Sequence, residues 1–239
     1  MSSTEPQGLL AIWANVDAAY QPAFVQWHNC EHVPERVSIP GFHVGHRYRA
    51  LDDEARDFYM VYETDTADVM QSEAYLHSQN NPTLWTRQSI GHFSDTLRTI
   101  YTLVASEGQR PALDAPYVLL VRSNPPHQPG GADEVIRWYR DEHLPRLCAV
   151  QGTLRARLYR ADAAISNIVT AERRVHGASS GTQEFMAVYE LRSPDIPASD
   201  AWRHAARGTP WSADMVAALR DLRRERYWLD FALWAPAHR

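Results

Sequence analysis

Two histidines, His32 and His143, are the side chains best suited to chemistry, because each lies in a Trp-x3-Glu-His-x-Pro motif. An imidazole gains or loses a proton near neutral pH, so it can serve as a general acid or base. The proline two residues later interrupts helical hydrogen bonding, which lets the histidine point between a helix and a sheet. Catalysis by at least one of them is predicted. The alternative is a structural role as a cap of the helix C-terminus.

A neighbouring histidine raises the question of a metal ion. His28 precedes His32 by four residues, a spacing at which two imidazoles can share a metal. Asn29 stands where a zinc protease of the HExxH type has its glutamate, and the second motif has Tyr139 in place of His28. No metal is therefore predicted, with His28 and His32 as the ligands if one is present.

The acidic residues of the motif, Glu31 and Glu142, each follow a tryptophan by four residues and share a helix face with it. Such an acid can orient the adjacent histidine, but a solvated carboxylate is the commoner role. We expect solvated carboxylates here. Trp27 and Trp138 are expected mainly in the core, with Trp27 also a candidate substrate contact.

The surroundings of the motif recur along the chain at an offset of 138 − 27 = 111 residues. After residue 58 the offset becomes 185 − 58 = 127, which predicts an inserted surface loop near 162–183. The chain is therefore predicted to hold two modules, 1–105 and 117–239, joined by a linker at 106–116. The identities at the first offset are Trp27/Trp138, Glu31/Glu142, His32/His143, Pro34/Pro145, Gly41/Gly152, Tyr48/Tyr159, Arg49/Arg160 and Ala50/Ala161.

Each module has the pattern of a βαββαβ unit. In the first module short apolar runs at 9–16 and 58–64 indicate buried strands, and residues 22–37 indicate a helix. The predicted class is α+β: two tandem ferredoxin-like modules, whose sheets pack face to face as an intramolecular barrel.

Alternation along the second strand of each module assigns its side chains to two faces. In the second module Leu154, Ala156 and Leu158 form the apolar face, which should lie against the helix. By equivalence His43 is expected under the first helix, close to His32. The other face would carry His46 and Tyr48 in the first module, and Arg157 and Tyr159 in the second.

Composition favours an ordinary globular protein with a small-molecule partner. The 239 residues carry a formal charge of −5, are 44% apolar, and hold no dense basic stripe, which argues against nucleic acid or a membrane surface as a partner. The apolar run at 9–16 is too short to span a membrane, and two cysteines at non-equivalent positions predict no disulfide framework. A cytoplasmic protein is expected, and a homodimer of fused modules stays open.

The helix with its Trp-x3-Glu-His-x-Pro motif, the following glycine and a strand with Tyr48-Arg49 resemble the EthD-like branch of the dimeric α+β barrel superfamily. The resemblance covers both halves. It implies two ferredoxin-like modules meeting sheet to sheet. It also implies activities such as those of cofactor-free lyases, cyclases, isomerases, decarboxylases and oxygenases acting on small, often aromatic molecules.

The predicted function is that of a cofactor-independent acid/base enzyme, a lyase, isomerase, dehydratase or decarboxylase, acting on a small hydrophobic carbonyl or aromatic compound. An oxygenase of the same fold, cofactor-free or using a metal or haem, and a non-enzymatic small-molecule-binding or stress-response barrel are the alternatives. The candidate catalytic residues are His32, His143, His43 and Tyr62, and the candidate substrate-binding residues are Trp27, Phe42, His46, Tyr48, Trp85, Arg157 and Tyr159.

Overall fold

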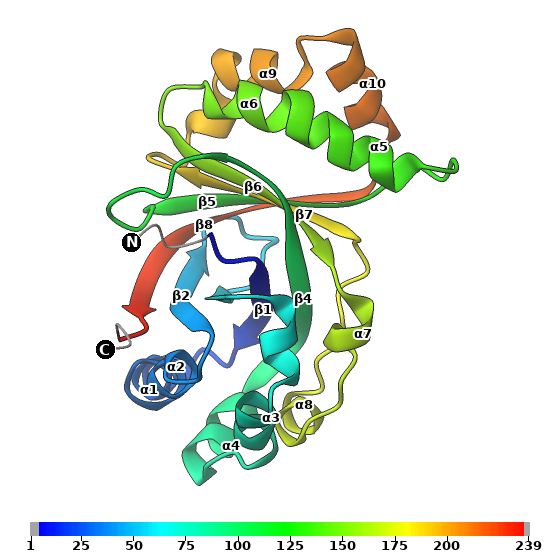
Figure 1. The fold of residues 1–239 in the computed structure, drawn as a ribbon. Coiled ribbons are helices and arrows are strands. Elements are labelled where there is room, and N and C mark those ends of the chain that lie inside the picture. Colours follow the sequence, from blue (N-terminus) through cyan, green and yellow to red (C-terminus); the bar gives the residue numbers. More distant parts are fainter. Residues whose placement is uncertain (1–4, 237–239) are drawn as a thin grey trace. The chain divides into compact units, whose positions relative to one another are not determined.

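The protein has a mixed α+β fold, seen in a computed structural model that describes residues 5–236 (Figure 1). Its eight long strands pair in the order β1-β3-β2-β8-β5-β7-β6-β4, and this order closes on itself as a barrel. The predicted α+β class is therefore confirmed. No helix among the described residues is long and apolar enough to cross a membrane.

The described chain divides into two compact units. Unit 1 comprises residues 5–102, 162–181 and 230–236, and unit 2 comprises 103–161 and 182–229. Strands β4 (Phe93–Gly108) and β8 (Arg220–Trp234) contribute residues to both units. The predicted module boundaries stay a prediction, because the units follow packing and not position along the chain.

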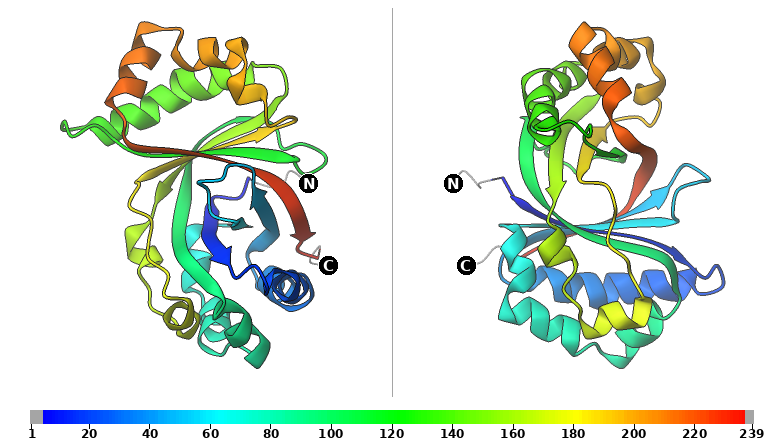
Figure 2. Two further views of the ribbon diagram at one scale, coloured as in Figure 1. Left: turned by 180° about the vertical axis from the view of Figure 1, so that it is seen from behind. Right: turned by 90° about the vertical axis from the view of Figure 1, so that its right-hand side faces the viewer.

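Unit 1 has its helices on one face of its strands (Figure 2). Strand β3 is buried along its whole length, which fits the run of apolar and aromatic residues from Phe58 to Tyr62. Besides parts of β4 and β8, the elements of unit 1 are β1 (Gly8–Val16), α1 (Gln21–Trp27), η1 (His28–His32), α2 (Val33–Val37), β2 (Phe42–Ala50), β3 (Phe58–Thr64), η2 (Ala67–Gln71), α3 (Glu73–Asn80), α4 (Leu84–Ile90), α7 (Ala163–Ser166) and α8 (Ala171–His176).

The first helix of unit 1 is continuous from α1 to α2 but contains a π-helical turn, η1. Pro34 has no N–H, and in an α-helix its ring would clash with the carbonyl four residues earlier. The wider turn accommodates the proline, and the backbone N–H of Val33 donates to the carbonyl of His28 instead. Pro145 follows a matching turn, η3, in unit 2. The motif therefore specifies a helix with a π turn that ends on its histidine.

Unit 2 is filled by an apolar core that includes Trp138, Tyr139 and Leu147 of its first helix, together with Tyr189 and Trp202. Besides parts of β4 and β8, its elements are β5 (Tyr117–Asn124), α5 (Gly131–Trp138), η3 (Tyr139–His143), α6 (Leu144–Cys148), β6 (Thr153–Ala161), β7 (Phe185–Leu191), η4 (Ile196–Ala198), α9 (Asp200–Arg207) and α10 (Pro210–Ala218).

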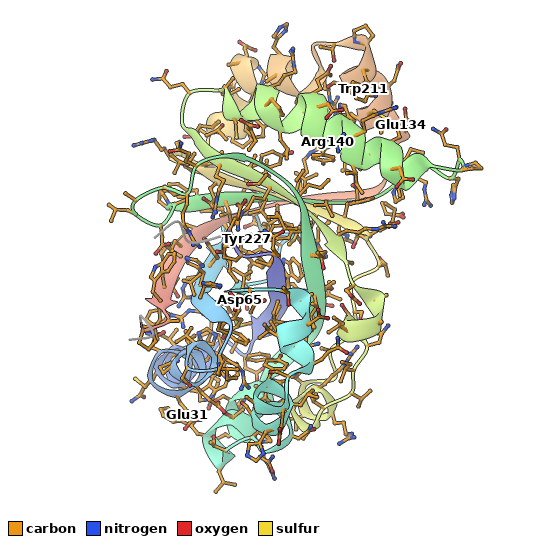
Figure 3. The ribbon with its side chains drawn as sticks, in the orientation of Figure 1. Glu31, Asp65, Glu134, Arg140, Trp211 and Tyr227 are labelled. Carbon is orange, nitrogen blue, oxygen red and sulfur yellow. The ribbon has the colours of Figure 1, made fainter. Side chains whose placement is uncertain are left out.

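The glutamates of the motif are half-buried and hydrogen-bonded, so the expectation of solvated carboxylates is wrong. Glu31 accepts hydrogen bonds from Thr83 Oγ1 at 2.6 Å and Thr86 Oγ1 at 3.0 Å, and Figure 3 shows it where the first helix meets α4. Trp27 Nε1 donates to the same Thr86 hydroxyl at 3.2 Å. In unit 2 Glu142 accepts from Thr209 and Ser212. In each unit the Trp and Glu side chains therefore tie the first helix to the start of a later helix, α4 in unit 1 and α10 in unit 2.

The segment predicted as an inserted surface loop is ordered, so that prediction is wrong in part. It forms α7 and α8 and packs within unit 1 against α3 and α4. Arg173 stabilises the folded segment, because its guanidinium donates hydrogen bonds to the carbonyls of Ser166, Ile168 and Ala178. This charged side chain of the segment thus makes internal contacts.

Candidate functional site

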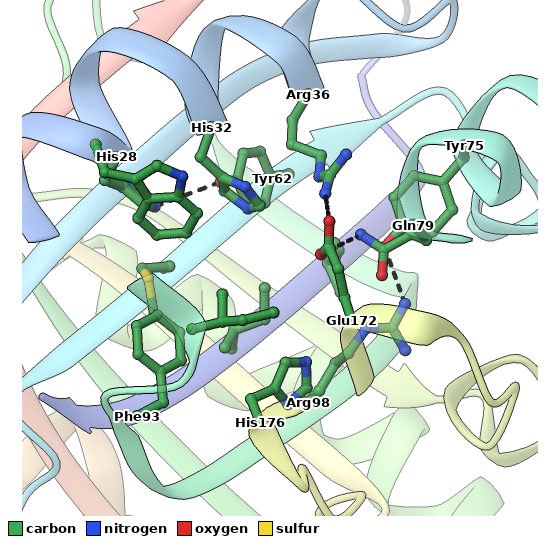
Figure 4. Close-up of a pocket in the computed structure, with 15 residues that line it drawn as sticks. His28, His32, Arg36, Tyr62, Tyr75, Gln79, Phe93, Arg98, Glu172 and His176 are labelled. Atoms are coloured by element: carbon green, nitrogen blue, oxygen red, sulfur yellow. Dashed lines mark hydrogen bonds and ion pairs between the residues drawn. The ribbon is translucent and has the colours of Figure 1, made fainter. Parts of the chain in front are cut away.

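Unit 1 contains a pocket between its first helix, its sheet and the helices α3 and α8 (Figure 4). Its empty space, including the open mouth, is about 470 Å³. One wall is apolar, and the other carries ionisable and amide groups. The lining residues are Leu10, Ile12, Trp27, His28, His32, Arg36, Met60, Tyr62, Tyr75, Gln79, Ile90, Phe93, Arg98, Glu172 and His176.

His32 lies at the end of η1, with its ring 4.5 Å from that of Trp27 between centroids. Its side chain is buried, and its Nδ1 has no hydrogen-bond partner among the described residues. Burial holds the pKa of His32 well below its usual value of 6.5, and the nearby positive charge of Arg36 lowers it further. The imidazole is therefore neutral near pH 7, the form that can accept a proton.

His28 and Tyr62 form a hydrogen-bonded pair beside His32. Arg47 donates to His28 Nδ1 at 3.2 Å, so the proton of this neutral imidazole resides on Nε2. His28 Nε2 therefore donates to the Tyr62 hydroxyl oxygen, 3.5 Å away. The hydroxyl hydrogen of Tyr62 is then available for a different acceptor. Burial lowers the pKa of His28 and raises that of Tyr62, so both stay uncharged. Tyr62 can thus donate a hydrogen bond to a substrate oxygen.

The opposite end of the pocket is built on a buried ion pair. Arg36, only 1% exposed, donates to Glu172 of α8 and to Ser78 of α3. Gln79 Nε2 donates to the second Glu172 oxygen at 2.8 Å. Burial raises the pKa of Glu172 although Arg36 opposes that shift, while Arg36 stays fully charged. Figure 4 shows these side chains meeting across the pocket from His28 and His32.

Four predicted site residues line the pocket together, namely His28, His32, Tyr62 and Trp27. Phe42 lies behind them, with its ring 6.0 Å from that of Tyr62, and Trp85 packs at the edge of the neighbouring core cluster. Neither of the last two is a lining residue.

His43 does not line the pocket, so its expected place beside His32 is wrong. The pairing of β2 with β3 shifts between Phe42 and Val44, and this irregularity changes the alternation of side chains. Phe42 packs in the core, whereas His43 is half-exposed and lies 2.6 Å from Asp65. Strand alternation could not reveal the shift.

His46 and Tyr48 lie on the face of β2 opposite Arg47, away from the pocket, as their alternation predicted. The His46 ring lies 5.8 Å from Tyr48 and 6.2 Å from Trp234. In unit 2 Arg157 pairs with Glu190 at 2.8 Å and its guanidinium lies 5.4 Å from the Tyr159 ring. Their roles in substrate binding stay predictions.

His143 occupies the position in unit 2 that His32 has in unit 1. Its ring lies 4.1 Å from Trp138 and 5.1 Å from Tyr139, and its Nδ1 also lacks a partner. Burial lowers the pKa of His143 to about 3. A tilted ring contact with tryptophan is thus common to both histidines, and the polar pocket wall beside His32 distinguishes the two.

Sequence reasoning missed Arg36, Glu172, His176, Gln79 and Arg98. A signal existed for Arg36, since the second copy has an apolar Leu147 there, and a charge at an inward-facing helix position is unusual. Glu172 and His176 gave no signal, because the insertion has no counterpart in the first copy.

Among residues 5–236, no group of three or more His, Cys, Asp and Glu side chains is placed to hold a metal ion together. The rings of His28 and His32 are 5.6 Å apart, and His28 Nδ1 is already engaged by Arg47.

Comparison with known proteins identifies the fold. No family model matches the chain, and no curated protein matches it in sequence. An anthrone oxidase-like protein matches in structure with a TM-score of 0.65 at 10% identity, covering 98% of this chain and 94% of that one. A monooxygenase-like protein from Fusobacterium nucleatum subsp. nucleatum matches with a TM-score of 0.58 at 8% identity, covering 96% and 95%.

A chlorite dismutase variant from Candidatus Nitrospira defluvii matches with a TM-score of 0.55 at 11% identity, covering 95% of this chain and 93% of that one. At such identities the similarity concerns the fold alone. The chain has the fold of the dimeric α+β barrel proteins.

Proposed function

We propose that this protein is a cofactor-independent enzyme that removes a proton from a small, mainly apolar carbonyl or phenol compound bound in the unit 1 pocket. The observation that carries the proposal is the neutral, buried His32, which lines an apolar wall beside a hydroxyl donor, Tyr62. A base and a hydrogen-bond donor at one cavity are the parts that proton abstraction next to a carbonyl needs.

In the proposed reaction the unprotonated nitrogen of His32 accepts a proton from an acidic C–H or O–H of the substrate. The electron pair left behind moves onto the substrate oxygen, which accepts a hydrogen bond from Tyr62. Return of the proton to another carbon gives an isomerase, and departure of a leaving group gives a lyase or dehydratase. The apolar wall keeps water from the anion.

The second candidate function is that of an oxygenase, and the fold shared with anthrone oxidase-like and monooxygenase-like proteins favours it. It would begin with the same proton transfer, because an electron-rich enolate or phenolate can be oxidised by O₂ without a cofactor. Oxygen uptake during turnover separates the two functions. A non-enzymatic barrel would instead retain its ligand unchanged.

We also infer that the halves are tandem ferredoxin-like modules of the EthD type. The same order of elements occurs twice, with α7 and α8 added in the second half. Each half places a π-helical turn on its motif and anchors Trp and Glu to a hydroxyl-bearing helix start. A small-molecule substrate and further homodimerisation are part of the same proposal.

The proton-transfer proposal is tested by hydrogen exchange in D₂O. Anthrone, aryl ketones, β-keto acids and aromatic lactones are incubated with protein, and deuterium incorporation is followed by NMR while an electrode records O₂. His32→Gln is expected to lower the rate by roughly 10²- to 10⁴-fold, the usual contribution of a general base. The matched control His143→Gln, at the same motif position in unit 2, is expected to change it little. Full activity in a folded His32→Gln protein would rule out the role.

A further inference from the structure

The polar end of the unit 1 pocket holds a cation that has no acidic partner among residues 5–236. Arg98 is 5% exposed, and its NH2 donates a hydrogen bond to the Tyr75 hydroxyl at 3.0 Å. Its NH1 is buried and makes no hydrogen bond with any described residue. A buried guanidinium with an empty donor is costly, because water no longer solvates it. An anionic ligand would remove that cost.

The charges around Arg98 do not compensate it. Among the fifteen lining residues, Glu172 is the acidic side chain, and it is already paired with Arg36. Arg36 also lies 3.5 Å from Glu35, so the two carboxylates at this end of the pocket both pair with Arg36. Arg173 stands nearby as a further cation, with its donors engaged by backbone carbonyls of the insertion. This end of the pocket has a surplus of positive charge.

His176 supplies a second donor next to Arg98. The backbone N–H of Ala178 donates to His176 Nδ1 at 3.1 Å, which places the proton of the neutral ring on Nε2. Burial, together with the nearby charges of Arg98 and Arg173, lowers the pKa of His176 to about 4, so the ring is neutral. The backbone of Arg98 is itself tied to the insertion, since its N–H donates to the Ser179 carbonyl at 2.9 Å.

We propose that Arg98 and His176 form a subsite for a carboxylate of the substrate, at the opposite end of the pocket from His32. One carboxylate oxygen would accept from Arg98 NH1 and the other from His176 Nε2. The apolar wall would hold the ring or chain between this anchor and the reacting carbon. This inference rests on the proposed function and narrows its substrate class to small aromatic or carbonyl acids.

The subsite is specific to unit 1. The residue 126 positions after Arg98 is Arg224, which is exposed on β8. His176 belongs to the inserted segment, which occurs once in the sequence and packs in unit 1, so unit 2 has no equivalent of it. A matched control is therefore available in the same protein, because Arg224 is the same residue type on the corresponding strand.

The test compares benzoate with benzamide, which have nearly the same shape and differ in charge. Their dissociation constants for the full chain are measured by calorimetry at pH 7.5. Wild type is expected to bind benzoate roughly ten- to a hundredfold more tightly, the worth of charge-assisted hydrogen bonds in a buried site. Arg98→Met should abolish the preference, and Arg224→Met should retain it. His176→Leu, which changes the insertion alone, should reduce benzoate affinity several-fold.

Equal affinity of wild type for the two probes, or binding of neither, overturns the subsite without the need for a variant. A benzoate preference that survives in Arg98→Met also overturns it. The proposed function fails separately: His32→Gln with full exchange activity would end the base role while leaving the benzoate preference intact. If His32→Gln loses exchange activity but wild type shows no preference for benzoate, the base role is supported and the carboxylate subsite is ruled out.

Discussion

Two matched motif positions carry residues of different chemistry in the two halves. Where unit 2 has Leu147 and Tyr139, unit 1 has Arg36 and His28 at the matching motif positions. Leu147 and Tyr139 fill the interior of unit 2. A buried guanidinium such as that of Arg36 requires an acidic partner and hydrogen-bond acceptors. Glu172 and Ser78 provide them. The chemistry of unit 1 thus resides in a few residues on a shared scaffold.

Removal of one partner of the Arg36–Glu172 pair is expected to destabilise the fold strongly, whereas replacement of both partners by apolar residues is expected to destabilise it little. Glu172→Ala removes the buried acid and leaves Arg36 with the more exposed Glu35 at 3.5 Å, which should lower the free energy of unfolding by about 3 kcal/mol. The double variant Arg36→Leu, Glu172→Leu should recover most of that loss, because Leu147 already fills the equivalent place in unit 2. Urea unfolding of Arg36→Leu, Glu172→Leu and the double variant measures the coupling. Purely additive losses would show that the pair is not coupled.

At the level of secondary-structure elements, the π-helical turn and the neighbouring strand together position His32 and Tyr62. The turn ends on His32 because Pro34 cannot continue an α-helix, and β3 holds Tyr62 under the same helix. The close approach of helix and strand requires a glycine on β2. A Cβ on Gly45 would lie 2.8 Å from a Tyr62 ring carbon and 2.9 Å from a Val33 methyl carbon.

Gly45→Ala is therefore expected to displace Tyr62 and to destabilise the fold by about 1–3 kcal/mol, the usual cost of overpacking. The rate of substrate proton exchange should fall with it, because the hydroxyl leaves its position. Ala156 is the equivalent residue in unit 2, so Ala156→Gly serves as the control for a change of the same size. That control should lower stability but leave the exchange rate unchanged. An unaltered rate in a destabilised Gly45→Ala protein would separate Tyr62 from the reaction.

At the scale of the whole chain, buried neutral histidines tie stability to pH. Burial lowers the pKa of His143 to about 3 and that of His176 to about 4, and it also lowers those of His28 and His32. In the unfolded chain each titrates near 6.5. As the pH falls below 6.5, these histidines become protonated in the unfolded chain but stay neutral in the folded one. The contribution of the neutral histidines to the free energy of unfolding is therefore complete above pH 6.5 and decreases below it.

The free energy of unfolding should therefore decrease between pH 6.5 and about pH 4, by up to about 1.4 kcal/mol per pH unit for each buried histidine. Urea unfolding at pH 7.5, 6.0 and 5.0 gives the slope. Replacing His143 with Gln should reduce the slope by about one histidine's share, since Gln does not titrate. A flat profile over this range would contradict the buried, neutral state of these residues.

From the sequence we could predict the α+β class, the helix that carries each motif and the presence of His32 and Tyr62 in one pocket. These follow from local rules, namely apolar periodicity, helix spacing and the effect of proline. Recurrence of the motif after 111 residues added matched positions at which the two halves can be compared.

Tertiary structure alone decided which side chains complete that site. A shift in strand pairing moved His43 out to Asp65, and no local pattern records such a shift. The insertion returns to unit 1, where it places Glu172 on Arg36 and His176 beside Arg98. These contacts join residues more than seventy positions apart. Their partners are selected by the need to compensate buried charge, a condition that exists only once the chain has folded.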